Sequence, residues 1–171
     1  MSTRLVLLVG APRSGTTWLQ TMLGAHPSVS TPQETDVFSR FLQPMLDSWN
    51  REVRGGPDGS ARRRYKGLHS VLTDAEFHAL GTRMLDEVID RAAALKPGAT
   101  VVVEKTPSHS TCAPAIAAFA PDAIVVHLVR DGRDAANSII SAGRTWGGWW
   151  APRSVSRAAS IWHDHVLGAR S

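Results

Sequence analysis

The sequence predicts an α/β, P-loop-like domain of three layers, in which a mainly parallel sheet lies between helices. Three observations lead to this class. Short, continuous apolar runs alternate with longer segments that carry apolar residues at helical spacing, as strands and helices do in parallel α/β sheets. A glycine-rich loop follows the first run directly, which is where such folds bind phosphate. The length fits a single domain over residues 1–171.

The first predicted elements are a strand, a loop and a helix. Leu5–Val9 is a continuous apolar run and predicts a buried strand. The loop Gly10–Gly15 follows, and Thr16–Ala25 then places tryptophan, leucine and methionine at helical spacing. We expect this helix to end before Pro27, because proline lacks a donor and disfavours a helical residue in front of it.

The middle of the chain predicts helices around an exposed insertion. Val29–Thr35 is short and interrupted by proline, which predicts a loop or an edge strand. A helix over Asp36–Trp49 follows. Arg51–Lys66 contains glycines, a proline and an arginine run, a composition typical of an exposed insertion. Asp74–Leu95 predicts a long amphipathic helix, capped by Thr73 with a glutamate three residues later.

The second half of the chain predicts two more buried strands, Thr100–Val103 and Ala123–Val129. Helices are predicted around Ala113–Ala120, over Ala135–Ala142 and over Ser154–Ala169. Doubly wound sheets usually have more than three clear strands. We therefore expect the sequence to be the N-terminal portion of a longer protein.

The positive charge is concentrated in one segment. Six of the 19 basic residues, but only two of the 15 acidic ones, lie within Arg51–Lys66, so the rest of the chain is neutral. This distribution argues against a nucleic-acid-binding surface spread over the protein. The single cysteine, Cys112, cannot form an internal disulfide, and no apolar run has the length of a signal-peptide core or a membrane span. We therefore expect a cytoplasmic protein with no membrane or nucleic-acid partner.

The loop over Gly10–Thr17 reads G-A-P-R-S-G-T-T. Backbone N–H groups in such a loop, together with the helix N-terminus behind it, can hold a phosphate. The loop nearly matches the nucleotide-binding pattern G-x-x-x-x-G-K-[ST], but Thr16 stands in place of the lysine, and the positive charge lies at Arg13. A P-loop kinase or nucleoside triphosphatase is thus one alternative, and a plain strand-to-helix turn is another.

Two motifs together resemble a known family. Pro12–Leu19, read as P-R-S-G-T-T-W-L, resembles the 5′-phosphosulfate-binding loop of sulfotransferases that use 3′-phosphoadenosine 5′-phosphosulfate (PAPS). The family's second signature is a strand that ends in arginine with a serine eight residues later, and it holds the 3′-phosphate. Arg130 and Ser138 supply this signature in the expected order. The resemblance covers about Leu5 to Ala142 and implies PAPS as the donor.

The resemblance also implies which residues bind the donor. An arginine at a strand end is a permanent, bidentate partner for a phosphate, although Arg130 alone could equally pair with Asp131 or Asp134. Trp18 corresponds to a tryptophan that stacks on adenine, but a core aromatic is an equal alternative. The donor-binding set implied is Arg13, Ser14, Gly15, Thr16, Thr17, Trp18, Arg130 and Ser138.

Transfer of the sulfuryl group calls for charge on the departing phosphate to be stabilised and for the acceptor to lose a proton. Arg13 and Lys105 are the candidate cations, and Lys105 could instead pair in solvent with Glu104. Glu34 stands directly before a threonine, as does the catalytic base of the tyrosylprotein sulfotransferase branch. Glu34 could instead cap the next helix, and His109 is the nearest equivalent of the histidine base in the cytosolic branch.

The sequence therefore predicts an enzyme that transfers a sulfuryl group from PAPS to a hydroxyl acceptor. No metal-ligand spacing occurs, so we expect no metal. The alternatives are a P-loop kinase or nucleoside triphosphatase, and a truncated nucleotide-binding module without turnover. Golgi tyrosylprotein sulfotransferases have a membrane anchor and paired cysteines, neither of which is evident in this sequence, so the resemblance does not identify the acceptor. We also expect the C-terminal part of the family domain to be absent.

Overall fold

The computed structural model describes residues 3–54 and 67–170. Within them, four parallel strands form one sheet in the order β2-β3-β1-β4. The strands are β1 (Arg4–Val9), β2 (Val29–Ser30), β3 (Val101–Glu104) and β4 (Ile124–His127). The expected α/β class with a parallel sheet is confirmed.

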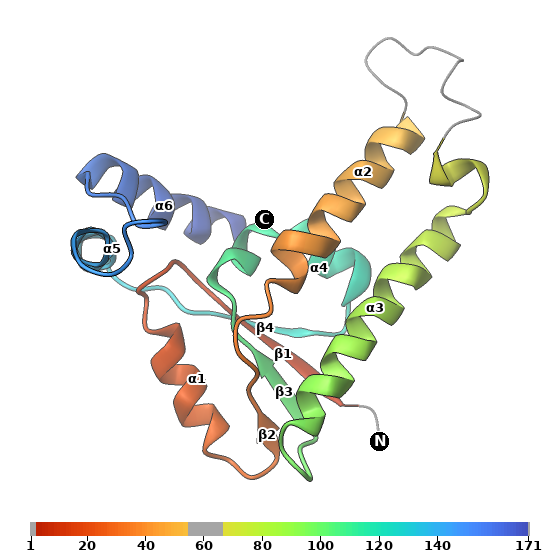
Figure 1. Ribbon diagram of the computed structural model, residues 1–171, viewed down its shortest axis with the longest axis horizontal. Helices are drawn as coiled ribbons and strands as arrows, with labels where there is room; N and C mark the ends of the chain where they lie inside the picture. The colour runs from red at the N-terminus through yellow and green to blue at the C-terminus, as the bar shows by residue number, and fades with distance from the viewer. Residues whose placement is uncertain (1–2, 55–66, 171) are drawn as a thin grey trace.

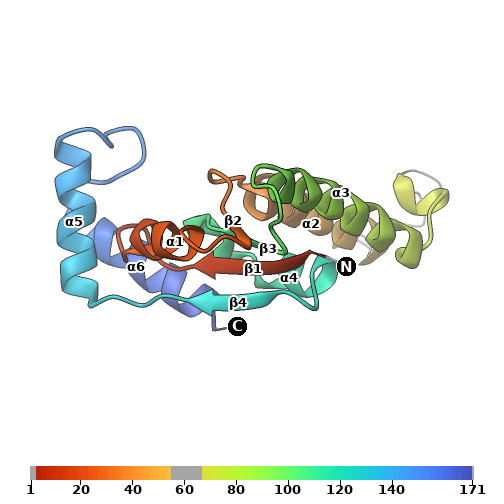
Figure 2. The same cartoon turned by 90° about the horizontal axis from the view of Figure 1, so that it is seen from below.

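Helices cover both faces of the sheet. Figure 1 shows α1 on one side of the strands and α3 and α4 on the other, as right-handed crossovers between these parallel strands require. Helices α5 and α6 pack on each other beyond the carboxyl ends of β1 and β4 (Figure 2). The α-helices are α1 (Thr16–Gly24), α2 (Gln43–Arg54), α3 (Asp74–Ala94), α4 (Ala113–Phe119), α5 (Gly132–Arg144) and α6 (Val155–Gly168). The described residues also form a π-helix, η1 (Val37–Leu42), and two short 3₁₀ helices, η3 (Leu68–Ser70) and η4 (Pro107–Thr111).

The strands differ in how deeply they are buried. Leu7 and Leu8 of β1 point to opposite faces and both are fully buried, as the continuous apolar run predicts. The strand β4 was expected to be buried too, yet Ile124 and Val125 are almost half exposed. The cause is position, because β4 lies at the edge of the sheet and β1 lies inside it.

The helix expected over Asp36–Trp49 is divided in two. The π-helix η1 comes first, and α2 begins only at Gln43. Pro44 explains the change, since it has no N–H to donate to the carbonyl four residues earlier. Helix α2 continues through residues 51–54, which the sequence assigned to the exposed insertion. The rest of that insertion, residues 55–66, lies outside the described residues.

Side chains cap the N-termini of three of the described α-helices, α3, α5 and α6. Thr73 forms the expected capping box with Glu76, in which the Thr73 hydroxyl accepts from the Glu76 N–H and the Glu76 carboxylate accepts from the Thr73 N–H. Helix α5 begins at Gly132, three residues before the predicted start, because Asp131 accepts a hydrogen bond from the Arg133 N–H.

The main core lies between the sheet and the helices η1, α2, α3 and α4. Its largest fully buried side chains include Phe38 of η1 and Phe119 of α4. Trp49 stacks on Phe77 with ring centroids 4.2 Å apart, and its indole N–H donates to Asp74. Phe38 also packs against His109, so η1 lies against η4, the turn that follows β3.

Candidate active site

The residues predicted for the site lie along one edge of the sheet. Parallel strands end on the same side, and open α/β sheets bind ligands there. Following the order of the strands, β2 leads to Glu34, β3 leads directly to Lys105, β1 leads to the loop of residues 10–17, and β4 leads to Arg130. The fold thus brings together four segments that are far apart in the chain.

The loop after β1 is shaped to receive an anion. A Cβ at Gly10 would lie 2.4 Å from the carbonyl oxygen of Leu128, so only glycine allows this close approach to the chain after β4. Gly15 has a φ of 97° and immediately precedes α1, a conformation that glycine adopts without strain. The hydroxyl of Ser14 is buried and has no hydrogen-bond partner among the described residues. An anion at this helix N-terminus would supply one.

The two predicted motifs contact each other directly. The Nε of Arg13 donates to the hydroxyl of Ser138 over 3.1 Å, across 125 positions of sequence. Arg130 donates to the backbone oxygen of Arg13 over 3.2 Å. Ser138 lies in the middle of α5 rather than at its start. Arg130 also lies 3.8 Å from Asp134, the ion pair considered as its alternative, while Asp131 pairs with Arg133 instead.

Three tryptophans border these motifs. Trp18 is 68% exposed on α1, so it is not a core residue. The guanidinium of Arg13 lies over the ring of Trp146, 5.7 Å from its centroid, a cation–π contact that the sequence did not predict. The indole N–H of Trp162, on α6, donates to the carbonyl of Arg130 over 3.0 Å. The hydrogen bond from Trp162 links α6 to the site. In the sequence, only the aromatic character of Trp162 could have indicated this contact.

Glu34 and Lys105 form an ion pair. Lys105 is almost fully buried, whereas the side chain of Glu34 is 47% exposed. Lys105 is therefore not the solvent-facing partner of Glu104 that the sequence left open. Glu34 does not cap the following helix either, since Asp36 precedes η1. The pair places a carboxylate at the surface of the site and an ammonium directly beneath it.

Glu104 and His109 form a separate, buried pair behind this one. Both side chains have 0% exposure, and Oε2 of Glu104 lies 2.8 Å from Nδ1 of His109. The other ring nitrogen of His109, Nε2, accepts from the backbone N–H of Phe38. Burial raises the pKa of Glu104, but His109 and the hydrogen bonds from Thr106 and Thr35 outweigh it, so the pKa is lowered. His109 has no exposed surface, so it is less well placed than Glu34 to meet an acceptor.

A cavity of about 480 Å³ opens beside the loop and the ion pair. Asp36 and Arg40, which form an ion pair with 3.0 Å between Oδ2 and Nε, stand on one wall. His165 of α6 stands on another, and burial lowers its pKa. No group of three or more His, Cys, Asp or Glu side chains within residues 3–54 and 67–170 is arranged as a metal site. The lining residues are Pro12, Arg13, Thr16, Thr17, Glu34, Asp36, Arg40, Pro107, Ser108, Trp146, Trp149, Trp150 and His165.

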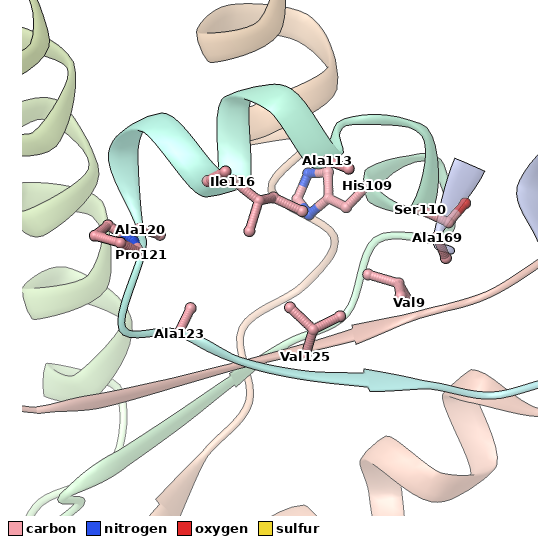
Figure 3. A pocket seen from close by; sticks show the side chains of 11 residues that line it. Val9, His109, Ser110, Ala113, Ile116, Ala120, Pro121, Ala123, Val125 and Ala169 are labelled. Carbon is pink, nitrogen blue, oxygen red and sulfur yellow. The ribbon is translucent and has the colours of Figure 1, made fainter. Parts of the chain in front are cut away.

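A second cavity, of about 300 Å³, lies against the sheet beside α4 (Figure 3). Its wall consists mostly of alanine, valine and isoleucine side chains, including Ile116 and Val125. Two polar side chains, those of His109 and Ser110, line this cavity, and both already have partners. It offers no cation to a phosphate, so the cavity beside Glu34 is the better candidate for the chemistry.

Alignments with protein-tyrosine sulfotransferases cover most of this chain. It is 32% identical over 147 residues to a protein-tyrosine sulfotransferase of Danio rerio and 28% identical over 145 residues to one of Homo sapiens. Each alignment includes 85% of this chain, but only 38% and 36% of the respective relative. The chain thus spans less than two fifths of the length of these relatives.

These relatives correct one expectation. Protein-tyrosine sulfotransferases are Golgi membrane enzymes, so the prediction of a cytoplasmic protein is wrong. It rested on one cysteine and on the shortness of the apolar runs, and neither property determines a compartment. In the part of the chain that the structure describes, no helix combines the length and apolar character needed to cross a bilayer.

Solved structures share the fold. The sulfotransferase domain of a Synechococcus olefin synthase matches 98% of this chain, and 60% of that domain is covered, with a TM-score of 0.60 and 20% identity. A sulfotransferase of Mycobacterium avium matches 99% of this chain and is itself 55% covered, with a TM-score of 0.54 and 18% identity. The family model described as "Sulfotransferase family" matches residues 6–170. The chain therefore belongs to the sulfotransferase family.

Proposed function

We propose that this chain carries the donor-binding and catalytic groups of an enzyme that transfers a sulfuryl group from PAPS to a hydroxyl acceptor. One observation carries the proposal. The loop after β1 and the arginine–serine motif after β4 are joined by hydrogen bonds from Arg13 to Ser138 and from Arg130 to Arg13. A single small nucleotide with phosphates at both its 3′ and 5′ positions can therefore bridge them.

The roles of the donor-binding residues follow from their positions. The N–H groups of the loop and the α1 N-terminus, together with the free hydroxyl of Ser14, would hold the 5′-phosphosulfate. Arg130 and Ser138 would hold the 3′-phosphate. Trp18 is exposed on α1, next to the loop, which suits stacking on adenine. These contacts use charge and backbone donors and require no metal ion.

The ion pair at the sheet edge suits the transfer step. PAPS, when bound, supplies the sulfuryl group. Arg13 and Lys105 would neutralise the charge that grows on the 5′-phosphate oxygen as its bond to sulfur breaks. We infer that this oxygen competes with Glu34 for Lys105, which frees the carboxylate. Glu34 would then take the proton of the acceptor hydroxyl as the acceptor oxygen bonds to sulfur.

The cavity of about 480 Å³ is the natural site for the acceptor. Glu34 is in its wall, and Trp146, Trp149 and Trp150 line one side of it. A volume of this size accepts a small molecule or one side chain of a larger substrate. The tryptophans suit an acceptor that carries its hydroxyl on a ring.

The test compares two nucleotides and then measures turnover. Calorimetric titration should give tighter binding for 3′-phosphoadenosine 5′-phosphate (PAP) without magnesium than for ATP with magnesium. Incubation with PAPS and a panel of a tyrosine peptide, 4-nitrophenol and a neutral sugar should release PAP and yield a sulfated product. Tighter binding of ATP, or its hydrolysis, would support the kinase or triphosphatase alternative. Binding of PAP without any transfer would support a nucleotide-binding module.

A further inference from the structure

The carboxylate of Glu104 is the centre of a buried hydrogen-bond network. Its Oε1 accepts from the Thr35 backbone N–H over 3.1 Å, from the Thr35 hydroxyl over 2.8 Å and from the Thr106 hydroxyl over 2.6 Å. Its Oε2 faces His109. A buried carboxylate stays ionised only when donors or a neighbouring cation favour its charged form; this one accepts three hydrogen bonds, and Nδ1 of His109 lies 2.8 Å from its second oxygen.

The network runs alongside the candidate catalytic pair. Glu104 directly precedes Lys105, and Thr35 directly follows Glu34. The contact between Thr35 and Glu104 is therefore one residue away from the ion pair between Glu34 and Lys105 in both segments of the chain. The side chain of Glu34 is half exposed, whereas that of Lys105 is buried. The point at which the Glu34 side chain leaves the main chain is therefore set by the neighbouring backbone.

His109 fixes the carboxylate in turn. Its Nε2 accepts from the Phe38 N–H, so the proton of the neutral ring lies on Nδ1, opposite Glu104. Its ring packs edge-on against Phe38, with centroids 5.1 Å apart. His109 thereby connects Glu104 to the first turn of η1, the element that follows the Glu34 loop. Both ends of that loop are tied to the same buried pair.

The loop that carries Glu34 is held in an uncommon backbone conformation. Asp36 has a φ of 54°, in the left-handed region that residues other than glycine seldom adopt. Its N–H donates to the Thr106 hydroxyl over 3.4 Å. Such a conformation persists when surrounding contacts determine it, and the bond to Thr106 adds to the contacts of the Asp36 carboxylate with Ser39, Arg40 and Ser108.

We propose that Glu104 is a positioning residue, which holds the backbone of Thr35 so that Glu34 meets Lys105 in the geometry needed to take a proton from the acceptor. His109 completes the device by keeping Glu104 in place. The inference rests on the proposed function, in which Glu34 is the base. It gives the second glutamate and the histidine of this region a role that involves no contact with substrate.

The first test changes only the Thr35 hydroxyl. Thr35→Val keeps the shape and the backbone N–H with its hydrogen bond to Glu104 but loses the hydrogen bond from the hydroxyl, whereas Thr35→Ser keeps both. With PAPS as donor, and 4-nitrophenol or water as acceptor, we expect kcat for PAP release to fall roughly tenfold in Thr35→Val. Thr35→Ser should restore most of it. The Kd for PAP should stay within about twofold in both variants.

A double-mutant cycle separates positioning from general destabilisation. If Glu104 acts through Glu34, Thr35→Val should leave kcat unchanged when Glu34 is already replaced by glutamine. The loss in melting temperature should be the same in both backgrounds. A tenfold loss of kcat in the Glu34→Gln background as well, or equal rates for Thr35→Val and Thr35→Ser, would overturn the positioning role.

A further pair of variants provides a readout without any ligand. Asn at position 109 can place an N–H where Nδ1 lies opposite Glu104, whereas Gln can place an oxygen where Nε2 accepts from Phe38. Hydrogen–deuterium exchange in the segment around Thr35 should therefore be faster in His109→Gln than in His109→Asn. Equal exchange would contradict the link through Glu104. An unmodified chain that releases no PAP from PAPS would instead overturn the proposed function, and this inference with it.

Discussion

Arg130 and Arg133 are three residues apart after β4, but their surroundings differ. Arg133 is 92% exposed, and two hydrogen bonds from its guanidinium and one from its backbone N–H to Asp131 lower the pKa of that carboxyl to about 2. Arg130 donates to the anion-binding loop at Arg13. We expect Arg130→Ala to weaken PAP binding by about 1.5–3 kcal/mol, the value of a hydrogen bond to a charged group, in calorimetric titration.

Arg133→Ala is the matched control for this prediction. It removes the same charge from the same segment but leaves the loop untouched, so the Kd for PAP should stay unchanged. Equal weakening in both variants would mean that only the net charge of the surface matters. An unchanged Kd in Arg130→Ala would remove the assignment of the 3′-phosphate.

Substitution of Glu34 should lower the rate of turnover without weakening the binding of PAP. Glu34→Gln keeps the size of the side chain and a hydrogen bond to Lys105 but cannot take a proton. We expect kcat for PAP release to fall by about 10²–10⁴, the usual contribution of a general base, with the Kd for PAP retained. Glu87→Gln, which alters an exposed ion pair with Arg91 on α3, should change neither. Full activity of Glu34→Gln would assign the base to another group.

At the residue scale, the sequence predicted best where a motif ties chemistry to spacing. The loop residues, Arg130 and Ser138 were found in this way, and the structure brings them into contact. The roles of Glu104 and His109 could not be found, because each depends on partners about 70 positions away that the fold alone supplies. A buried histidine and a reactive one look the same in a sequence.

At the scale of elements, Gly81 determines how α3 meets α4. A Cβ at this position would lie 2.3 and 2.5 Å from ring carbons of Phe119, whose side chain is fully buried. Alanine favours a helix by about 1 kcal/mol over glycine, but an overpacked core typically costs about 1–3 kcal/mol. The difference between the two effects leads us to expect that Gly81→Ala lowers the free energy of unfolding by up to about 2 kcal/mol in urea denaturation.

The smaller side chain in Phe119→Leu supplies the control for Gly81. With the ring removed, Gly81→Ala should become neutral or stabilising, because only the helix preference is left. The same destabilisation in both backgrounds would show that the contact with Phe119 is not the cause.

The elements themselves were largely predictable, and their exceptions have local causes. Periodicity gave the type of every long helix, because the amphipathic pattern is repeated over several turns. The π-helix η1 was not predicted. Pro44 removes one backbone donor, and the sequence does not show which carbonyls the remaining N–H groups of the preceding turn will bond. The exposure of β4 was missed because its apolar pattern is the same as that of β1, and only the strand order distinguishes edge from centre.

At the scale of the whole molecule, the site depends on strand order rather than on chain order. Glu34 and Lys105 meet because β2 lies next to β3, and Arg13 meets Arg130 because β1 lies next to β4. The sequence predicts a parallel sheet but not this order. Once the order is known, the row of carboxyl ends places Glu34, Lys105, the loop after β1 and Arg130 along one edge.

The pH dependence of folding should reflect histidines held neutral by the fold. Burial lowers the pKa of both His127 and His165. In the unfolded chain these side chains take up protons near pH 6.5, whereas the folded chain does so only at lower pH. The unfolded state therefore binds more protons below about pH 6.5, and the free energy of unfolding should fall as the pH decreases through that window.

Urea denaturation at several pH values between about 8 and 5.5 measures this slope. His165→Gln should make it shallower, because one of the two groups no longer titrates. His163→Gln, on the exposed side of the same helix, is the matched control and should keep the slope of the unmodified chain. Stability that increases as the pH falls, or equal slopes for the two variants, would mean that burial does not hold His165 in its neutral form. Below about pH 4.5 a further loss is expected, since the lowered pKa of Glu104 stabilises the fold only while that carboxylate is ionised.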